Sequence, residues 1–546
     1  MASNYGNLTV LIVDPNVGMR GNLHNMLNQC NITKIEYAVS SGTAVRQLRK
    51  KPYDVILCEY DLGNGQDGQD GQQLLEDLRT HKLIELWTIF FMITSERVYS
   101  KVMGAAELSP TDYILKPFTV DMLMQRIVRA LEKRADFFTI YQAMMQGNLR
   151  EAIRICELGQ SKIPRHALEF VRLRAELLLN LGEAEEAEAI YSQLCETDRP
   201  LPWATLGLAK AWIQLDKLDD AERILSQLAA HNHKFISAYD LLAKVYEKMG
   251  KLQATQEVLT DAVSKSPHVV KRLRRLGEVA IDNKDAETAE RSLKQVVAKA
   301  RYSEFRDPED HLKLVQALVQ KGDATQAAGV IRDLEKSLRG IPKMEACRLI
   351  SVAMLYDATG NPSSAAAELQ RAVQVARDTP GLSQRSMVTL AQNCIAKKMD
   401  DEATSVLMSL TGNMEADFTM RDAMSIAERS GRPDLAQHLS RQLAQQVKDL
   451  LRQAQEKASL GDIRGAVQLM QEAVHMAPEN AEVLSQAANM TMRQLDMQGW
   501  EHAFGEQARQ YLDQIKRREP NHAQLAEMLK TYQAVQRKYG IGANQA

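Results

Sequence analysis

The sequence predicts a doubly wound α/β domain with a five-stranded parallel sheet, followed by an all-α solenoid of helical repeats. Two observations support this division of the 546-residue chain. Up to residue 133, short apolar runs alternate with amphipathic segments, a pattern typical of βα units and a parallel sheet. From residue 134 onwards the strand patterns stop and a period of about 34 residues appears, which indicates stacked helix pairs.

Composition excludes several classes of protein. A chain of 546 residues is too long for one hydrophobic core. Its net charge of −2, without a block of Lys and Arg, argues against a nucleic-acid-binding surface. The six cysteines are scattered, lack zinc-site spacing and suit a reducing compartment. No signal pattern and no apolar run near the ~20 residues that span a bilayer are found. We therefore expect a cytoplasmic protein without membrane insertion.

In the first domain, five expected strands alternate with five expected helices. The strand-like runs are residues 8–13, 35–38, 55–58, 87–93 and 112–115. The helical patterns lie near 17–30, 41–50, 72–81, 97–106 and 119–132. Because parallel strands end at the same edge of a sheet, the residues at their carboxyl ends should lie close together. Four of these residues are polar and chemically distinct: Asp14, Glu59, Thr94 and Lys116.

This pattern resembles the receiver domain of bacterial response regulators, which has a flavodoxin-like fold. The motifs that carry the resemblance are LIVDPN from residue 11, VILCEYDLG from 55, FMITS from 91 and DYILKPF from 112. The resemblance implies that Asp14 is an acidic-pocket residue and that Thr94 and Tyr113 are switch residues. It also implies that Lys116 contacts phosphate and that position 59 is the phosphoacceptor position.

Two residues depart from the receiver pattern. Glu59 replaces the expected aspartate, and Pro15 replaces the second acidic residue of the first-strand pair. The extra methylene of Glu59 advances its carboxylate by roughly 1.5 Å, and a misplacement of about 1 Å can cost on the order of 100-fold in rate. Pro15 offers no ligand to Mg²⁺, so Asp14 and Asp61 would form a weak metal site at most. We expect no cofactor other than weakly bound Mg²⁺.

The departures leave several interpretations open. The longer arm of Glu59 brings negative charge towards Lys116 and Thr94, where it would hold the domain in an activated-like state without phosphate. Alternatively, the phosphorylation site has decayed and the domain is a scaffold. Phosphorylation at Asp61 is a third, weaker interpretation. The loop after the third strand also carries a duplicated Gln-Asp-Gly, at residues 66–68 and 69–71.

From residue 134, a turn residue is followed five positions later by a small residue in ten successive units. The turn residues are Gly147, Gly182, Asp216, Gly250, Lys284, Gly322, Gly360, Lys398, Gly431 and Gly461. Their spacings are 35, 34, 34, 34, 38, 38, 38, 33 and 30 residues. Gly ends the first helix because it tolerates φ > 0, and a small residue lets the paired helices approach closely.

The array resembles tetratricopeptide repeats over residues 134–500, with residues 501–546 as capping helices and a frayed tail. The 38-residue spacings predict longer helices or loops in those units. No Pro or Gly occurs from Thr119 to Gln146. We therefore expect the last helix of the first domain to lead into the first repeat with little or no flexible linker.

No catalytic motif or DNA-binding motif accompanies the repeats, so we expect a non-enzymatic output by protein binding. The favoured hypothesis is a signalling adaptor in a two-component phosphorelay, with a sensor histidine kinase or another response regulator as partner. A phosphate sink for a histidine kinase and an assembly factor with a relic receiver are the alternatives, and homodimerisation stays open. Partner binding is expected on first helices of the repeats, at Arg172, Lys210, Lys244 and Arg274.

Overall fold

A computed structural model describes residues 5–63, 70–95, 110–196, 200–267, 269–301, 303–411 and 418–541. The chain forms two compact units, Met1–Asp323 and Ala324–Ala546. The first unit holds the α/β domain and the first helical repeats, and the second unit holds the remaining repeats. The boundary predicted at 133/134 falls inside a helix of the first unit.

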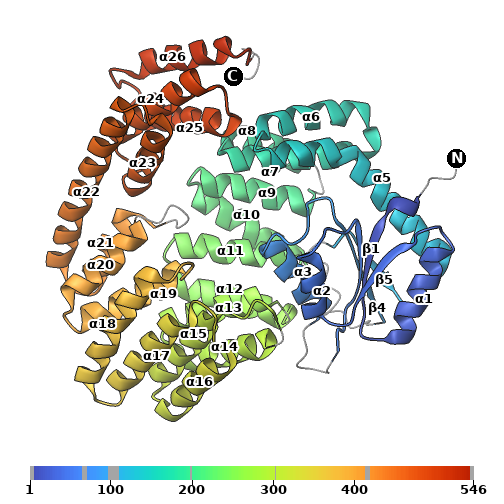
Figure 1. Cartoon of the computed structure of the whole chain (residues 1–546), viewed down its shortest axis with the longest axis horizontal. Helices are drawn as coiled ribbons and strands as arrows, with labels where there is room; N and C mark the ends of the chain where they lie inside the picture. The colour runs from blue at the N-terminus through green and yellow to red at the C-terminus, as the bar shows by residue number, and fades with distance from the viewer. Residues whose placement is uncertain are drawn as a thin grey trace. The chain divides into compact units, whose positions relative to one another are not determined.

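Five parallel strands form one sheet in the first unit (Figure 1). They are β1 (Thr9–Val13), β2 (Lys34–Ala38), β3 (Val55–Glu59), β4 (Ile89–Thr94) and β5 (Asp112–Leu115). Their order is β2-β1-β3-β4-β5, so the winding direction reverses beside β1. Central strands β1, β3 and β4 are almost wholly buried, as their continuous apolar runs predict. The predicted doubly wound parallel sheet is confirmed.

Helices cover both faces of this sheet (Figure 1). Helices α2 (Ser41–Leu48) and α3 (Gly71–Thr80) pack on one face through Val45, Leu74 and Leu78. Helices α1 (Val17–Asn28) and α5 (Val120–Met145) supply the core of the other face. The helix predicted at 97–106 lies outside the described residues.

Helix α5 joins the α/β domain to the repeats without a break. Its first half contributes Leu123 and Ile127 to the core beneath the sheet. Its second half contributes Phe137 and Ile140 to the core of the first repeat. The absence of a flexible linker, predicted from the lack of Pro and Gly, is confirmed by this single 26-residue helix.

Antiparallel helix pairs continue through the rest of the first unit. They are built from α6 (Leu149–Lys162), α7 (Ala167–Leu181), α8 (Ala184–Cys195), α9 (Pro202–Gln214), α10 (Leu218–His231), α11 (Ile236–Lys248), α12 (Leu252–Lys265), α13 (Val270–Asp282), α14 (Ala286–Ala300) and α15 (Pro308–Lys321). Two short 3-10 helices, Tyr5–Asn7 and Pro164–His166, complete the unit's helices among the described residues.

The second unit is entirely helical where it is described. Its helices are α16 (Ala324–Ser337), α17 (Met344–Ala358), α18 (Pro362–Asp378), α19 (Gln384–Ala396), α20 (Asp400–Thr411), α21 (Met420–Arg429), α22 (Pro433–Ser459), α23 (Ile463–Met476), α24 (Ala481–Gln498), α25 (His502–Arg518) and α26 (Leu525–Lys538). The 27-residue α22 fuses the second helix of one repeat with the first helix of the next. Residues 542–546 of the expected tail lie outside the described residues.

All ten predicted turn residues have left-handed backbone conformations, with φ between 57° and 88°. The small residue five positions after each turn is at most 2% exposed, from Ala152 to Ala466. Left-handed φ at the turn and a buried small side chain are the two requirements from which the repeat was predicted. The all-α repeat solenoid is therefore confirmed. Across the described ranges, no helix combines the length and apolarity needed to cross a membrane.

Candidate functional site at the carboxyl edge of the sheet

The sheet brings together the polar residues predicted from the strand ends. Glu59 and Thr94 end β3 and β4, and Asp14 and Lys116 directly follow β1 and β5. Backbone hydrogen bonds fix the spacing at this edge: the Tyr60 amide donates to Ile93 O at 3.0 Å, and the Lys116 amide donates to Thr94 O at 2.8 Å. The four residues therefore lie at one edge of the sheet because the strands are parallel and in register.

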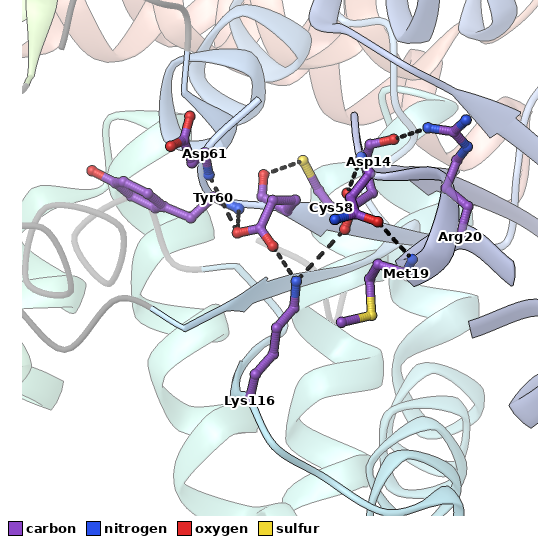
Figure 2. Close-up of polar contacts among 9 residues, drawn as sticks. Asp14, Met19, Arg20, Cys58, Tyr60, Asp61 and Lys116 are labelled. Carbon is purple, nitrogen blue, oxygen red and sulfur yellow. Dashed lines mark hydrogen bonds and ion pairs between the residues drawn. The ribbon is translucent and has the colours of Figure 1, made fainter. Parts of the chain in front are cut away.

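Glu59 and Lys116 form an ion pair at the centre of the site. Glu59 Oε2 accepts from Lys116 Nζ, while Oε1 accepts from the amides of Tyr60 at 2.7 Å and Asp61 at 3.3 Å. The two side chains are 11% and 18% exposed, so the pair is largely withdrawn from water. Lys116 Nζ also lies 3.6 Å from Asp14 Oδ2, and Figure 2 shows the Lys116 side chain directed towards Asp14. Both carboxylate oxygens of Glu59 are therefore engaged within the chain.

Asp14 completes the acidic side of the site. It is 3% exposed, and its Oδ2 lies 3.6 Å from Lys116 Nζ. Its Oδ1 accepts from the Asn16 amide at 2.7 Å, and Arg20 Nη1 donates to its backbone carbonyl at 2.6 Å (Figure 2). Arg20 was not predicted as a site residue, although the sequence shows that it lies about one turn into the helix that follows Asp14.

Cys58 lies beside the ion pair and was also not predicted as part of the site. Its thiol is fully buried and donates to Glu59 O at 3.3 Å. Burial, followed by the negative charges of Glu59, Asp14 and Asp70, raises the pKa of Cys58 well above its usual value. The thiol therefore stays protonated and is a poor nucleophile.

Of the two predicted switch residues, Thr94 ends β4 and Tyr113 lies within β5. Thr94 is 2% exposed at the end of β4. The ring of Tyr113 packs against the core on the α2–α3 face of the sheet, and its hydroxyl is buried. Thr94 is thus buried, whereas Tyr113 is partly buried with its hydroxyl enclosed.

Asp61, the second carboxylate predicted for a weak metal site, makes a hydrogen bond within its own turn. It is exposed, and its Oδ1 accepts from the Gly63 amide at 3.0 Å within its own turn. Asp14 and Glu59 both face the ammonium of Lys116, and Pro15 supplies no donor. Within the described ranges, no group of three or more His, Cys, Asp or Glu side chains has a metal-binding arrangement. The donors present fit Mg²⁺ poorly, because Mg²⁺ needs carboxylates that are free to coordinate it.

Three of the four basic residues predicted for partner binding reach solvent from first helices of different repeats. Lys210 on α9 and Lys244 on α11 are exposed. Arg172 on α7 is 51% exposed, although it pairs with Glu176 and lies over the Trp203 ring. Lys210 and Lys244 thus reach solvent from α9 and α11.

Arg274 on α13 differs from these three because its guanidinium is used within the chain. It makes two hydrogen bonds to Asp310, at 2.6 and 2.9 Å, and the Asp310 side chain is 2% exposed. Although burial opposes the charge, the ion pair with Asp310 raises the pKa of Arg274. The local pattern could not predict this, because Asp310 lies 36 residues away.

Comparisons with known proteins agree with the geometry of the first domain. The response regulator receiver domain family matches residues 10–128. Chemotaxis protein CheY-3 of Vibrio cholerae is 27% identical over 127 residues, which are 23% of this chain and 94% of that protein. Chemotaxis protein CheY of Pseudomonas aeruginosa is 25% identical over 126 residues, 23% of this chain and 98% of that protein. The chain therefore carries a receiver domain, as its motifs predicted.

Two solved structures resemble the helical part at low similarity. A tetratricopeptide repeat protein from Parabacteroides merdae has a TM-score of 0.36 and 14% identity, covering 50% of this chain and 98% of that one. The APC/C hetero-tetramer Cut9-Hcn1 has a TM-score of 0.29 and 11% identity, covering 73% of this chain and 96% of that one.

Proposed function

We propose that this chain, which joins a receiver domain to a helical-repeat array, is an atypical response regulator that acts as a protein-binding adaptor. Its receiver works without phosphorylation, and its repeats bind a protein partner. The partner belongs to a two-component phosphorelay in the cytoplasm, as a sensor histidine kinase or another response regulator. The chain itself catalyses no reaction.

The ion pair between Glu59 and Lys116 is the observation that carries this proposal. A phosphorylated receiver would present negative charge to its lysine, and here Glu59 supplies negative charge to Lys116 permanently. Phosphoryl transfer depends on positioned metal and charge around the transferred group. Pro15 and the engaged Asp14 leave little for a metal to bind, so we propose no phosphoryl step.

The architecture supports protein binding as the output. Repeat arrays stack helix pairs into extended surfaces that hold segments of other proteins. Exposed Lys210 and Lys244 occupy related positions on successive first helices of the array. The continuous helix α5 links the receiver core to the first repeat core, so the input domain and the binding surface share one structural element.

Incubation of the purified chain with acetyl phosphate and Mg²⁺ tests the proposal directly. We expect no stable phosphoprotein by intact mass and no tight binding of beryllofluoride. The double variant Glu59→Asp with Pro15→Asp should gain both, at least in part, because it restores the acceptor length and a metal ligand. Phosphate on the unmodified chain, at Asp61 or elsewhere in the site, would instead favour the phosphate-sink function.

A further inference from the structure

Successive helices from α12 to α15 are joined by three connections, and the longest of these contacts the receiver. Lys284 and Gly322 are 38 residues apart, whereas the three preceding spacings are 34 residues. The additional length lies between α14 and α15, where residues 301–307 separate the helices. The corresponding connection between α12 and α13 spans only residues 266–269.

Ser303 and Phe305 in this connection pack against the receiver. Ser303 is 5% exposed, and its hydroxyl donates to Asp77 Oδ2 of α3 at 2.7 Å. The Phe305 ring stacks on His81 with centroids 3.9 Å apart and planes 12° apart. The guanidinium of Arg49 lies 5.6 Å from the same ring centroid. Phe305 also packs against the apolar core on the α2–α3 face.

Basic residues of α13 lie within electrostatic range of the same helix. Burial raises the pKa of Glu76 on α3, and the negative charge of Asp77 raises it too, whereas the charges of Lys271, Arg274 and Arg272 oppose this rise. These three basic residues help to line a groove of about 620 Å³ beside α13. The groove also carries Asp240, Glu247 and Glu278, and Arg272 and Arg274 pair with Asp240 and Asp310.

Helix α3 also connects this contact to the site that holds Glu59. The Gly71 amide at the start of α3 donates to Tyr60 O at 2.7 Å. A Cβ atom at position 71 would lie 2.4 Å from Glu59 O, so the helix begins directly against the backbone of the site. One ten-residue helix therefore has its first residue at the ion-pair site and Asp77 at the repeat connection.

We propose that residues 303–305 are a docking element that binds the α2–α3 surface of the chain's own receiver and holds the acidic side of α3 near α13. The receiver is then attached to the repeats at two places, through α5 and through this element. The proposal goes beyond the adaptor function by identifying the surface through which the receiver contacts the repeat array. It is argued from contacts within the chain and does not depend on the proposed function.

A pair of engineered cysteines tests the docking without any partner or phosphoryl donor. Asp77→Cys with Ser303→Cys should form a disulfide under mild oxidation within the monomer, identified by peptide mass mapping. His24→Cys with Ser303→Cys is the control, because His24 lies on α1 at the opposite face of the sheet. Oxidation no faster than in the control, or a covalent dimer in place of a monomer, would overturn docking within one chain.

Hydrogen–deuterium exchange supplies a second readout in the full-length chain. Phe305→Ala and His81→Ala remove opposite sides of the same ring stack, and each should speed exchange in α3 at least ~10-fold. Tyr356→Ala, at an exposed aromatic residue of the second unit, is the control and should leave α3 unchanged. Unchanged α3 exchange in both test variants would overturn the docking element. Because no partner is present, that failure would leave the adaptor function untouched.

Discussion

Lys116 donates to Glu59 Oε2, and this ion pair joins the ends of β3 and β5 across the sheet edge. Because both side chains are mostly buried, removing one leaves the other charge poorly solvated. We expect Lys116→Met to lower the free energy of unfolding by about 1–3 kcal/mol. Urea titration followed by circular dichroism measures the change.

The double variant Glu59→Gln with Lys116→Met separates the ion pair from other effects of each substitution. Because the pair is already absent in either single variant, the double variant should lose less stability than the sum of the two losses. A coupling energy of about 0.5–3 kcal/mol is expected for directly interacting residues. Additive losses would show that Glu59 and Lys116 do not stabilise each other.

A second prediction concerns pH and the anchor of α5 on the sheet. Arg134 of α5 donates to Asp54 Oδ1 at 2.9 Å, and Thr9 donates to Oδ2 through its amide and its hydroxyl. Burial raises the pKa of Asp54. The hydrogen bonds and the charge of Arg134 lower it by more, so the net pKa lies below its usual value. A lowered folded-state pKa stabilises the fold above the unfolded pKa of ~3.9, and this stabilisation is lost as pH falls through the folded pKa.

The stability advantage of the natural chain over Asp54→Asn should therefore be largest near pH ~7 and shrink below pH ~4. Urea titrations at a series of pH values measure this difference. Arg134→Ala, which removes one of the groups that lower the pKa, should give a weaker pH dependence than the natural chain. Parallel pH profiles for the natural chain and Asp54→Asn would contradict the role of Asp54.

Two glycine-to-alanine substitutions, one in a repeat turn and one within a helix, should change the stability in opposite directions. Gly250 has φ of 73°, and a Cβ atom at this position would meet no heavy atom within 4 Å, so Gly250→Ala costs only backbone strain. We expect a loss of about 1–2 kcal/mol. Gly329 lies in helix α16, also without a close neighbour, so Gly329→Ala should gain about 0.5–1 kcal/mol. Thermal unfolding should show opposite shifts; equal shifts would contradict the left-handed requirement at the turn.

The sequence was sufficient wherever a local pattern or the repeat period determines the structure. Turns at Lys284 and Lys398 have no glycine, yet the period placed them correctly because neighbouring units supply the register. Strand ends at Asp14 and Lys116 were likewise predictable from abrupt changes between apolar and polar residues. The start of β4 was predicted two residues early: Trp87 is apolar, but its ring packs edge-on against Phe138 of α5 before the strand begins.

Contacts between distant segments could not be predicted from local patterns. The hydrogen bond from Ser303 to Asp77 joins residues 226 positions apart, and nothing near either residue specifies the other. The pairing of Arg274 with Asp310 could not be predicted for the same reason, so Arg274 was assigned from the sequence to the partner-binding surface. The fused helix α22 shows a different limit, because the repeat period gives the positions of turns but not the continuity of helices between them.

The last prediction concerns the partner-binding surface of the repeats. Lys210 and Lys244 are exposed, on α9 and α11, whereas Arg274 is bound to buried Asp310. Reversing two exposed charges should remove favourable contacts to an acidic segment without disturbing the core. We therefore expect Lys210→Glu with Lys244→Glu to weaken binding of the purified partner, once it has been identified by pull-down, at least ~10-fold, with unchanged circular dichroism.

Two further variants distinguish binding from stability. Lys336→Glu reverses an exposed charge on α16 in the second unit and should leave affinity unchanged. Arg274→Glu should instead destabilise the fold by about 3–5 kcal/mol, because it leaves the Asp310 carboxylate buried beside a second negative charge. Undiminished binding by the Lys210 and Lys244 double variant would move the partner site to the 38-residue units or to the receiver.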